Sequence, residues 1–158
     1  KFKKIDYLDT GLNSDILGRI KKGKKYYNDY LLICYGDTLV DLNINSLIKK
    51  HIVTKSNLTI SIYNPKINFG ILDVDNKDNV RAFNEKPKLN NWINVGFILV
   101  KKSKFFQLSK KFNTFKSFLE SLDKMEKIKA FKHKGNHITV NTLTELDEAK
   151  KNIKFFKK

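Results

Sequence analysis

The longest apolar run of the chain is Tyr30 to Tyr35, Tyr-Leu-Leu-Ile-Cys-Tyr, which stops at Gly36 and Asp37. Such a run between polar segments is typical of a parallel strand that is buried on both faces. The carboxyl ends of these strands open onto the crevice where α/β sheets bind ligands. Asp37 is therefore predicted at the rim of a sheet. There it could hold a divalent metal ion against phosphate oxygens, or it could cap the following helix.

Apolar residues then follow the helix and strand periods in turn. Residues 44–52 carry an apolar residue every three or four positions, which predicts a helix with one apolar face formed by Ile44, Leu47, Ile48 and Ile52. Residues 58–63 alternate apolar residues with Thr and Ser, which predicts a strand with one polar face. A helix between two strands predicts a right-handed crossover connection.

The same alternation continues to the end of the chain. Residues 69–74 and 80–83 predict a hairpin around a polar turn. Thr142 and Glu145 form a capping-box pattern at the start of the last helix. Further strands are predicted over 1–7, 92–100, 128–132 and 138–140, and further helices over 21–29, 103–108 and 115–125. We therefore expect one α/β domain over residues 1–158, with a mixed sheet flanked by helices.

Composition agrees with a folded domain and favours anionic partners. The chain has 158 residues, of which 41% are hydrophobic and 12% aromatic, which is enough for a core and excludes a disordered chain. Its formal charge is +16. Lysine pairs are spread along the whole chain, which indicates a general lysine bias rather than one nucleic-acid-binding face.

Cysteine content and hydropathy bear on the compartment. Cys34 is the only cysteine, so no intramolecular disulfide can form, and its place in the apolar run predicts a buried thiol. No apolar stretch reaches the ~18 residues of a membrane span, and no signal-peptide pattern opens the chain. We expect a cytoplasmic protein. Because the chain opens on Lys1 and reads like the middle of a protein, we also expect a missing N-terminal part.

Two polar clusters were weighed as metal sites. Residues 75–79 are rich in Asp and Asn but lack the glycine and closing glutamate of a calcium loop, so a solvated turn is favoured. His133 and His137 flank Gly135 and have no third ligand nearby, which disfavours zinc. Pro87 is expected to hold Lys86 in an extended conformation suited to a fixed phosphate donor.

Seven short segments stand out by their order and spacing: Asp9-Thr10-Gly11, Gly18-Arg19-Ile20, Tyr35-Gly36-Asp37, Phe69-Gly70, Phe83 to Pro87, Trp92 to Phe97 and Ala130 to His133. Taken together, they resemble the sugar-phosphate nucleotidylyltransferases, and most closely those that act on glucose 1-phosphate with CTP. The resemblance implies a Rossmann-like fold, Mg²⁺ as cofactor, and transfer of a nucleotidyl group from a nucleoside triphosphate to a sugar 1-phosphate with release of pyrophosphate.

The resemblance also implies roles for single residues. Asp37 matches the first metal-binding aspartate, and Lys86 matches the lysine that contacts the sugar phosphate, so these two are the implied catalytic residues. Asn141 stands where the family has its second metal aspartate, and its amide oxygen would hold Mg²⁺ more weakly. The implied substrate-binding residues are Arg19, Glu85, Asn94 and Gly96.

One departure from the family leaves alternatives open. The family's glycine-rich Gly-Gly-x-Gly-Thr-Arg loop, which cradles the nucleotide phosphates, occurs nowhere in the 158 residues. The chain alone is therefore expected to be inactive. A non-catalytic sugar-phosphate-binding or assembly module is the first alternative. A basic nucleic-acid-binding domain is disfavoured because most aromatic residues lie in apolar stripes. No membrane partner is expected, and a homo-oligomer stays open.

Overall fold

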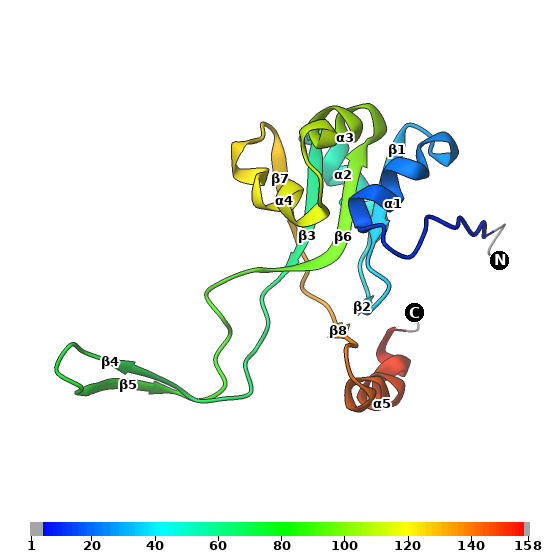
Figure 1. The fold of residues 1–158 in the computed structure, drawn as a ribbon. Helices are drawn as coiled ribbons and strands as arrows, with labels where there is room; N and C mark the ends of the chain where they lie inside the picture. Colours follow the sequence, from blue (N-terminus) through cyan, green and yellow to red (C-terminus); the bar gives the residue numbers. More distant parts are fainter. Residues whose placement is uncertain (1–4, 157–158) are drawn as a thin grey trace. The chain divides into compact units, whose positions relative to one another are not determined.

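A mixed sheet flanked by helices forms the centre of the fold in the computed structural model, which describes residues 5–156 (Figure 1). The main sheet has the strand order β1-β6-β3-β7. Its strands are β1 (Tyr30–Cys34), β6 (Ile93–Lys101), β3 (Leu58–Tyr63) and β7 (Ile128–Lys132). Two small antiparallel sheets pair β2 (Thr38–Val40) with β8 (His137–Thr139) and β4 (Ile71–Val74) with β5 (Val80–Asn84).

Helices and strands are interspersed along the chain, which confirms the predicted α/β class. Within residues 5–156, none of these helices is both long and apolar enough to cross a membrane.

The α-helices are α1 (Ile16–Lys22), α2 (Ile44–Val53), α3 (Lys102–Leu108), α4 (Phe115–Glu120) and α5 (Leu143–Asn152). Short 3₁₀ helices are η1 (Lys24–Tyr26), η2 (Ser109–Lys111), η3 (Leu122–Lys124) and η4 (Ile153–Phe156).

The main sheet contains both strand directions. Beside β1 and β6, Lys102 donates to the carbonyl of Asp29 and Tyr35 donates to the carbonyl of Gly96, so these strands are antiparallel. Beside β3 and β7, Asn57 donates to Lys127 and His133 donates to Ile62, so these strands are parallel. The prediction of a mixed sheet is therefore confirmed.

The contacts of the chain group into two compact units. Unit 1 holds the described residues up to Ile33, together with Asn45–Thr59 and Ile98–Lys129. Unit 2 holds Cys34–Ile44, Ile60–Phe97 and the described residues from Ala130 on. Every strand of the main sheet continues from one unit into the other, so this division leaves the prediction of a single domain open.

The core of unit 1 is aliphatic and aromatic. The rings of Phe105 and Phe118 are fully buried with centroids 5.5 Å apart, and each contributes about 1.5–3 kcal/mol through burial. On α2 the buried residues are Leu47 and His51, whereas Ile52 is 57% exposed, so the predicted apolar face is partly wrong. Burial lowers the pKa of His51, whose Nδ1 lies 2.8 Å from Thr59 Oγ1.

Burial in the strands also differs from the prediction. β1 is an edge strand that is covered on one face: Leu31 and Ile33 are buried, while Leu32 and Cys34 are exposed, so the predicted buried thiol is wrong. In β3, Thr59 and Ser61 are fully buried, which contradicts the predicted polar face.

The N-terminal segment differs as well. α1 begins directly after Asp15, whose carboxylate accepts from the amides of Gly18 and Phe115 over 2.8 and 2.7 Å. Arg19 therefore lies in a helix, and the predicted helix over 21–29 is replaced by the end of α1 and by η1. The predicted strand over 1–7 lies partly outside the described residues, and residues 5–7 have no regular structure.

The hairpin of β4 and β5 is confirmed. Asp75 closes its turn by accepting hydrogen bonds from the amides of Lys77 and Asn79 and from the Arg81 guanidinium. The hydrogen bonds from Asn79 are the largest cause that lowers the pKa of Asp75 to about 2. The Asp75 carboxylate thus accepts hydrogen bonds from protein donors. These contacts account for the Asp- and Asn-rich sequence of the turn.

Candidate functional site

The ladder of β2 and β8 adjoins the two residues that were predicted to hold a metal ion. Thr38 pairs with Thr139, and the Val140 amide donates to the backbone carbonyl of Asp37 over 2.8 Å. The neighbour of Asp37 across the ladder is therefore Val140, the residue before Asn141, although the two segments are far apart in the sequence. Neither short strand carries a periodic pattern, and β2 was not predicted.

The carboxylate of Asp37 is exposed and makes few contacts with other side chains. Its Oδ1 accepts a hydrogen bond from Thr38 Oγ1 at 3.2 Å, and it takes part in no ion pair within residues 5–156. β2 follows Asp37 directly, so the alternative that this residue caps a helix is wrong. The carboxylate keeps lone pairs available for a cation.

Asn141 sits at the entrance of α5, beside a second carboxylate. The amides of Asn141 and Thr142 both donate to Glu145 Oε2, over 2.7 and 2.9 Å, and the Glu145 amide donates to Thr142 Oγ1. The predicted capping box is therefore confirmed. The hydrogen bond from the Asn141 amide is the largest cause that lowers the pKa of Glu145, which keeps this carboxylate charged beside Asn141.

The donor set suits a metal ion that is shared with a substrate. Asp37 offers one charged carboxylate and Asn141 one amide oxygen, and residues 5–156 contain no cluster of three or more His, Cys, Asp or Glu that would close a metal site. Mg²⁺ is usually held by one or two carboxylates together with water and phosphate oxygens. The chemistry of these two side chains therefore fits Mg²⁺ bound jointly with a phosphate.

Restoring a carboxylate at the second position tests this arrangement. In Asn141→Asp, millimolar Mg²⁺ is expected to raise the melting midpoint by about 3 °C more than in the original protein, as tenfold tighter binding would. Without Mg²⁺ the two like charges repel, so the variant should melt at a lower temperature near neutral pH than the original protein does. Asn68→Asp, also in unit 2, controls for the added charge. Equal responses to Mg²⁺ in Asn141→Asp and the original protein would count against a metal role.

Asn94 and Gly96 belong to a packed cluster around Tyr35. Gly96 has a φ of +75°, and its amide donates to Asn94 Oδ1 over 2.9 Å. Asn94 Nδ2 in turn donates to the Tyr35 hydroxyl over 3.3 Å. Burial raises the pKa of Tyr35, and the charge of Asp37 adds to this effect. The absence of a side chain at Gly96 thus leaves room for the side chain of Tyr35.

Glu85 and Lys86 follow the end of β5, and both are exposed. Lys86 Nζ lies 3.9 Å from Glu85 Oε1. Lys86 has a φ of +45°, so the expected extended conformation is wrong. Pro87 disfavours the right-handed helical region for the preceding residue, and Lys86 takes the left-handed region instead. Within residues 5–156 no hydrogen bond or ion pair joins Lys86 to Asp37 or Asn141, so a common site for the three residues stays a prediction.

Arg19 is the one predicted site residue in unit 1. Its Nε donates to the carbonyl of Ser14 over 2.8 Å, and its side chain is exposed. This contact closes the turn that leads into α1. The structure therefore gives Arg19 a local role at the start of the helix.

A charged clamp that sequence reasoning missed fixes the loop before β8. Asp41 Oδ1 accepts from the Asn136 amide over 2.7 Å and lies 3.0 Å from His133 Nε2, while Asp41 Oδ2 accepts from Asn136 Nδ2. His133 Nε2 is thereby occupied by protein groups, since it also lies 3.0 Å from the carbonyl oxygen of Asn136. The clamp holds β8 in register with β2, and so helps to place Val140 and Asn141 beside Asp37.

A pocket of about 440 Å³ in unit 2 opens beside Asp37. Most of its lining is apolar, and Lys150 adds a positive charge that is shared with Asp147 at 3.0 Å. Asp37 therefore borders a space large enough for part of a small ligand. The pocket is lined by Gly36, Asp37, Thr38, Leu39, Val140, Leu146, Ala149, Lys150 and Ile153.

Known proteins similar to this chain share its sequence over most of its length. Residues 10–147 match the family model for nucleotidyl transferase. A protein of Bacillus subtilis (strain 168) named "Probable glucose-1-phosphate cytidylyltransferase" is 30% identical over 151 residues, which cover 94% of this chain and 59% of the relative. A glucose-1-phosphate cytidylyltransferase of Salmonella typhi is 31% identical over 145 residues, which cover 89% of this chain and 56% of the relative.

The fold is also similar to that of a solved protein. The crystal structure of HddC from Yersinia pseudotuberculosis superposes with a TM-score of 0.62 at 24% identity, and the match covers 88% of this chain and 62% of HddC. At this identity the likeness shows the fold alone. The chain spans less than two thirds of the length of these relatives.

Proposed function

Because the chain belongs to the nucleotidyl transferase family, we propose that it is the part of a sugar-1-phosphate nucleotidylyltransferase that holds the metal ion and the sugar phosphate. The observation that supports the proposal is the β2–β8 ladder, in which the backbone of Asp37 binds Val140, the residue before Asn141. The reaction joins a nucleoside triphosphate and a sugar 1-phosphate into a nucleotide sugar and pyrophosphate. CTP and glucose 1-phosphate are the proposed substrates, because both relatives named above are cytidylyltransferases.

The reaction needs positioning more than acid–base chemistry. A phosphate oxygen of the sugar 1-phosphate bonds to the α-phosphorus of the triphosphate, and the bond from that phosphorus to the β-phosphate oxygen breaks. Pyrophosphate leaves with the electron pair of the broken bond. Two anions must approach each other, so fixed cations lower the barrier. When bound, Mg²⁺ would neutralise the charge of the phosphates.

The residues of this chain have separate tasks in the proposal. Asp37 and Asn141 would hold Mg²⁺, and Lys86 would bind the sugar phosphate. Glu85 would accept a hydrogen bond from a sugar hydroxyl, while Asn94 and Gly96 would shape the sugar pocket together with Tyr35. Arg19 is proposed to bind substrate from α1. The triphosphate itself requires backbone amides of a glycine-rich loop, and these 158 residues contain no such loop.

Binding of glucose 1-phosphate tests the proposal in the chain as it is. We expect calorimetry with Mg²⁺ present to detect binding, and Lys86→Gln to weaken it by about tenfold, because one charge-assisted hydrogen bond to phosphate is lost. Lys77→Gln removes the same charge from the hairpin turn and should leave the affinity unchanged. If the original protein fails to bind glucose 1-phosphate, the proposed function is wrong. If Lys86→Gln binds as well as the original, only the role of Lys86 is wrong.

A further inference from the structure

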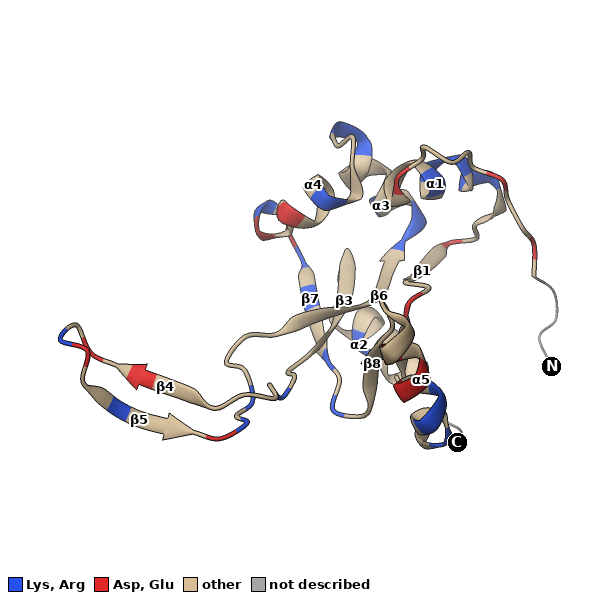
Figure 2. Cartoon of the chain, turned by 60° about the horizontal axis from the view of Figure 1, so that its bottom comes forward, with Lys and Arg blue, Asp and Glu red and all other residues tan. Residues whose placement is uncertain are grey.

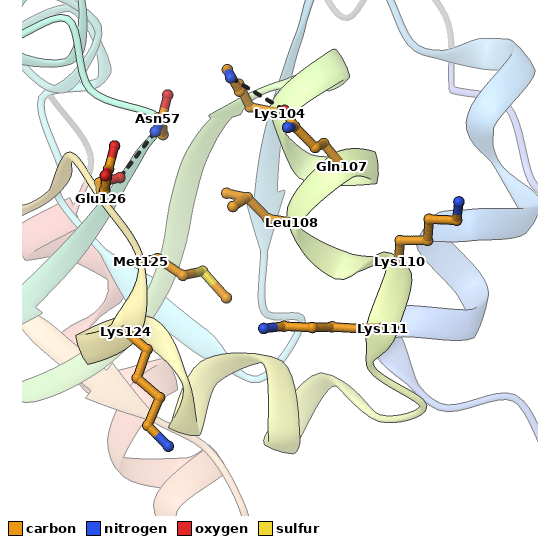
Figure 3. A pocket seen from close by; sticks show the side chains of 9 residues that line it. All are labelled: Asn57, Lys104, Gln107, Leu108, Lys110, Lys111, Lys124, Met125 and Glu126. Carbon is orange, nitrogen blue, oxygen red and sulfur yellow. Dashed lines mark hydrogen bonds between the residues drawn. The ribbon is translucent and has the colours of Figure 1, made fainter.

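A second pocket lies in unit 1 and contains none of the residues assigned above. It has a volume of about 740 Å³ (Figure 3). Its walls come from α3, from η2, from the connection between η3 and β7, and from Asn57 before β3. The pocket is lined by Asn57, Lys104, Gln107, Leu108, Lys110, Lys111, Lys124, Met125 and Glu126.

The lining is richer in lysine than the chain as a whole. Four of its nine residues are lysines, whereas lysine provides 30 of all 158 residues, and Figure 2 shows basic residues on elements throughout the described chain. Glu126 is the only acidic residue in the lining. None of the four lysines forms an ion pair with another described residue; Lys104 Nζ donates to Gln107 Oε1 over 3.2 Å. An uncompensated positive charge around a concave surface favours an anion.

The floor of the pocket is apolar. The side chains of Leu108 and Lys111 extend into the opening from the wall formed by α3 and η2, and Met125 points into it from the other side (Figure 3). The far wall is fixed by Asn57, whose Nδ2 donates to the carbonyl of Glu126 and whose amide donates to the carbonyl of Lys127, both over 2.9 Å. This wall is therefore held by hydrogen bonds of the chain itself.

We propose that this pocket binds an organic phosphate with a flat apolar group, of the size of a nucleoside monophosphate. Its volume lies within the roughly 300–1,000 Å³ of small-molecule sites. Lys111, whose side chain extends into the opening, offers an ammonium donor to the phosphate (Figure 3). Leu108 and the Met125 thioether offer a soft surface to a ring. Inorganic phosphate would leave that surface uncovered, so the mixed lining favours the organic ligand.

The test uses AMP as the probe, followed by amide chemical shifts of the full chain in NMR spectra. We expect AMP to shift the amides of residues 104–111 and 124–126, and inorganic phosphate at the same ionic strength to bind at least tenfold more weakly. Lys111→Gln should weaken AMP binding by about tenfold, as loss of one charge-assisted contact does. Lys49→Gln removes one charge from α2, outside the pocket, and should keep the affinity of the original protein.

Two further variants make the result decisive. Met125→Ser should weaken AMP binding while leaving inorganic phosphate unaffected, and Asp37→Asn should leave the AMP shifts at this pocket unchanged. Spectra of each variant without ligand show whether it is folded. If Lys49→Gln weakens AMP binding as much as Lys111→Gln does, or if AMP shifts the amides of exposed lysines throughout the chain, the proposal is wrong. AMP would then bind through the general excess of lysine. Equal affinity for AMP and inorganic phosphate would contradict the proposal that the ligand carries an organic group.

Discussion

Replacing Asp37 by asparagine is expected to slow nucleotidyl transfer by about two to three orders of magnitude. The substitution keeps the shape of the side chain but removes the one full negative charge that the chain offers to Mg²⁺. Loss of a charge at ~4 Å in a partly desolvated site costs on the order of 4 kcal/mol, and every 1.36 kcal/mol changes a rate tenfold. The assay is pyrophosphate release from CTP and glucose 1-phosphate by an enzyme that carries this chain together with a glycine-rich nucleotide loop.

Two controls separate a metal effect from misfolding. Asp73→Asn removes an exposed carboxylate from β4 and should leave the rate unchanged. Raised Mg²⁺ should recover part of the rate of Asp37→Asn, because the amide oxygen still coordinates weakly. An unchanged rate in Asp37→Asn at limiting Mg²⁺ would remove Asp37 from the site. The chain alone should release no pyrophosphate above a protein-free control.

Gly96→Ala should be the most destabilising of the small substitutions. Its φ of +75° disfavours any side chain by about 1–2 kcal/mol, and a Cβ would lie 2.5 Å from Cγ and 2.6 Å from Cβ of Tyr35. These atoms are held close to the backbone and cannot swing away. We expect a loss of about 3 kcal/mol in the free energy of unfolding, which lowers the melting midpoint by about 6–12 °C.

Gly36→Ala is the matched control for this substitution. It adds the same methyl group nearby in the same unit, but its Cβ would meet no atom within 4 Å. Its melting midpoint should stay close to that of the original protein, and thermal melts followed by circular dichroism compare the two. If the melting midpoint of Gly96→Ala matches that of Gly36→Ala, the cluster around Tyr35 can rearrange to accept a side chain at position 96 at little cost in stability.

Local patterns predicted the elements with the clearest periodicity. The strands over 58–63 and 128–132 match β3 and β7 at both ends. The hairpin of β4 and β5 and the capping box of α5 were also predicted correctly, because turn residues and caps act on their own neighbours. Each of these features depends on residues that are close together in the sequence.

Burial was harder to predict because it depends on neighbours from elsewhere in the chain. Cys34 looked buried within an apolar run, but β1 lies at the edge of the sheet and is covered on one face. Thr59 looked exposed, yet it is buried against His51, and each satisfies a polar atom of the other. Lys86 took a left-handed conformation that its sequence neighbours did not specify.

The candidate site was predictable only in part. The resemblance pointed to Asp37 and Asn141. The approach of the two segments that carry them depends on two strands of three residues each, which are too short to show a period of apolar residues. The Asp41 clamp joins residues from distant segments, and no local signal could have revealed it. The roles of Arg19, Lys86 and Asn94 in substrate binding stay predictions.

The ladder of β2 and β8 also determines when, during synthesis of the chain, the proposed metal site can form. Asp37 leaves the ribosome early, but the backbone partner that fixes it, Val140, is made about a hundred residues later. At ~5–20 residues per second this delay is on the order of 5–20 seconds. A nascent chain can therefore fold much of unit 1 while Asp37 still lacks its partner, and affinity for metal should arise only as the last helix emerges.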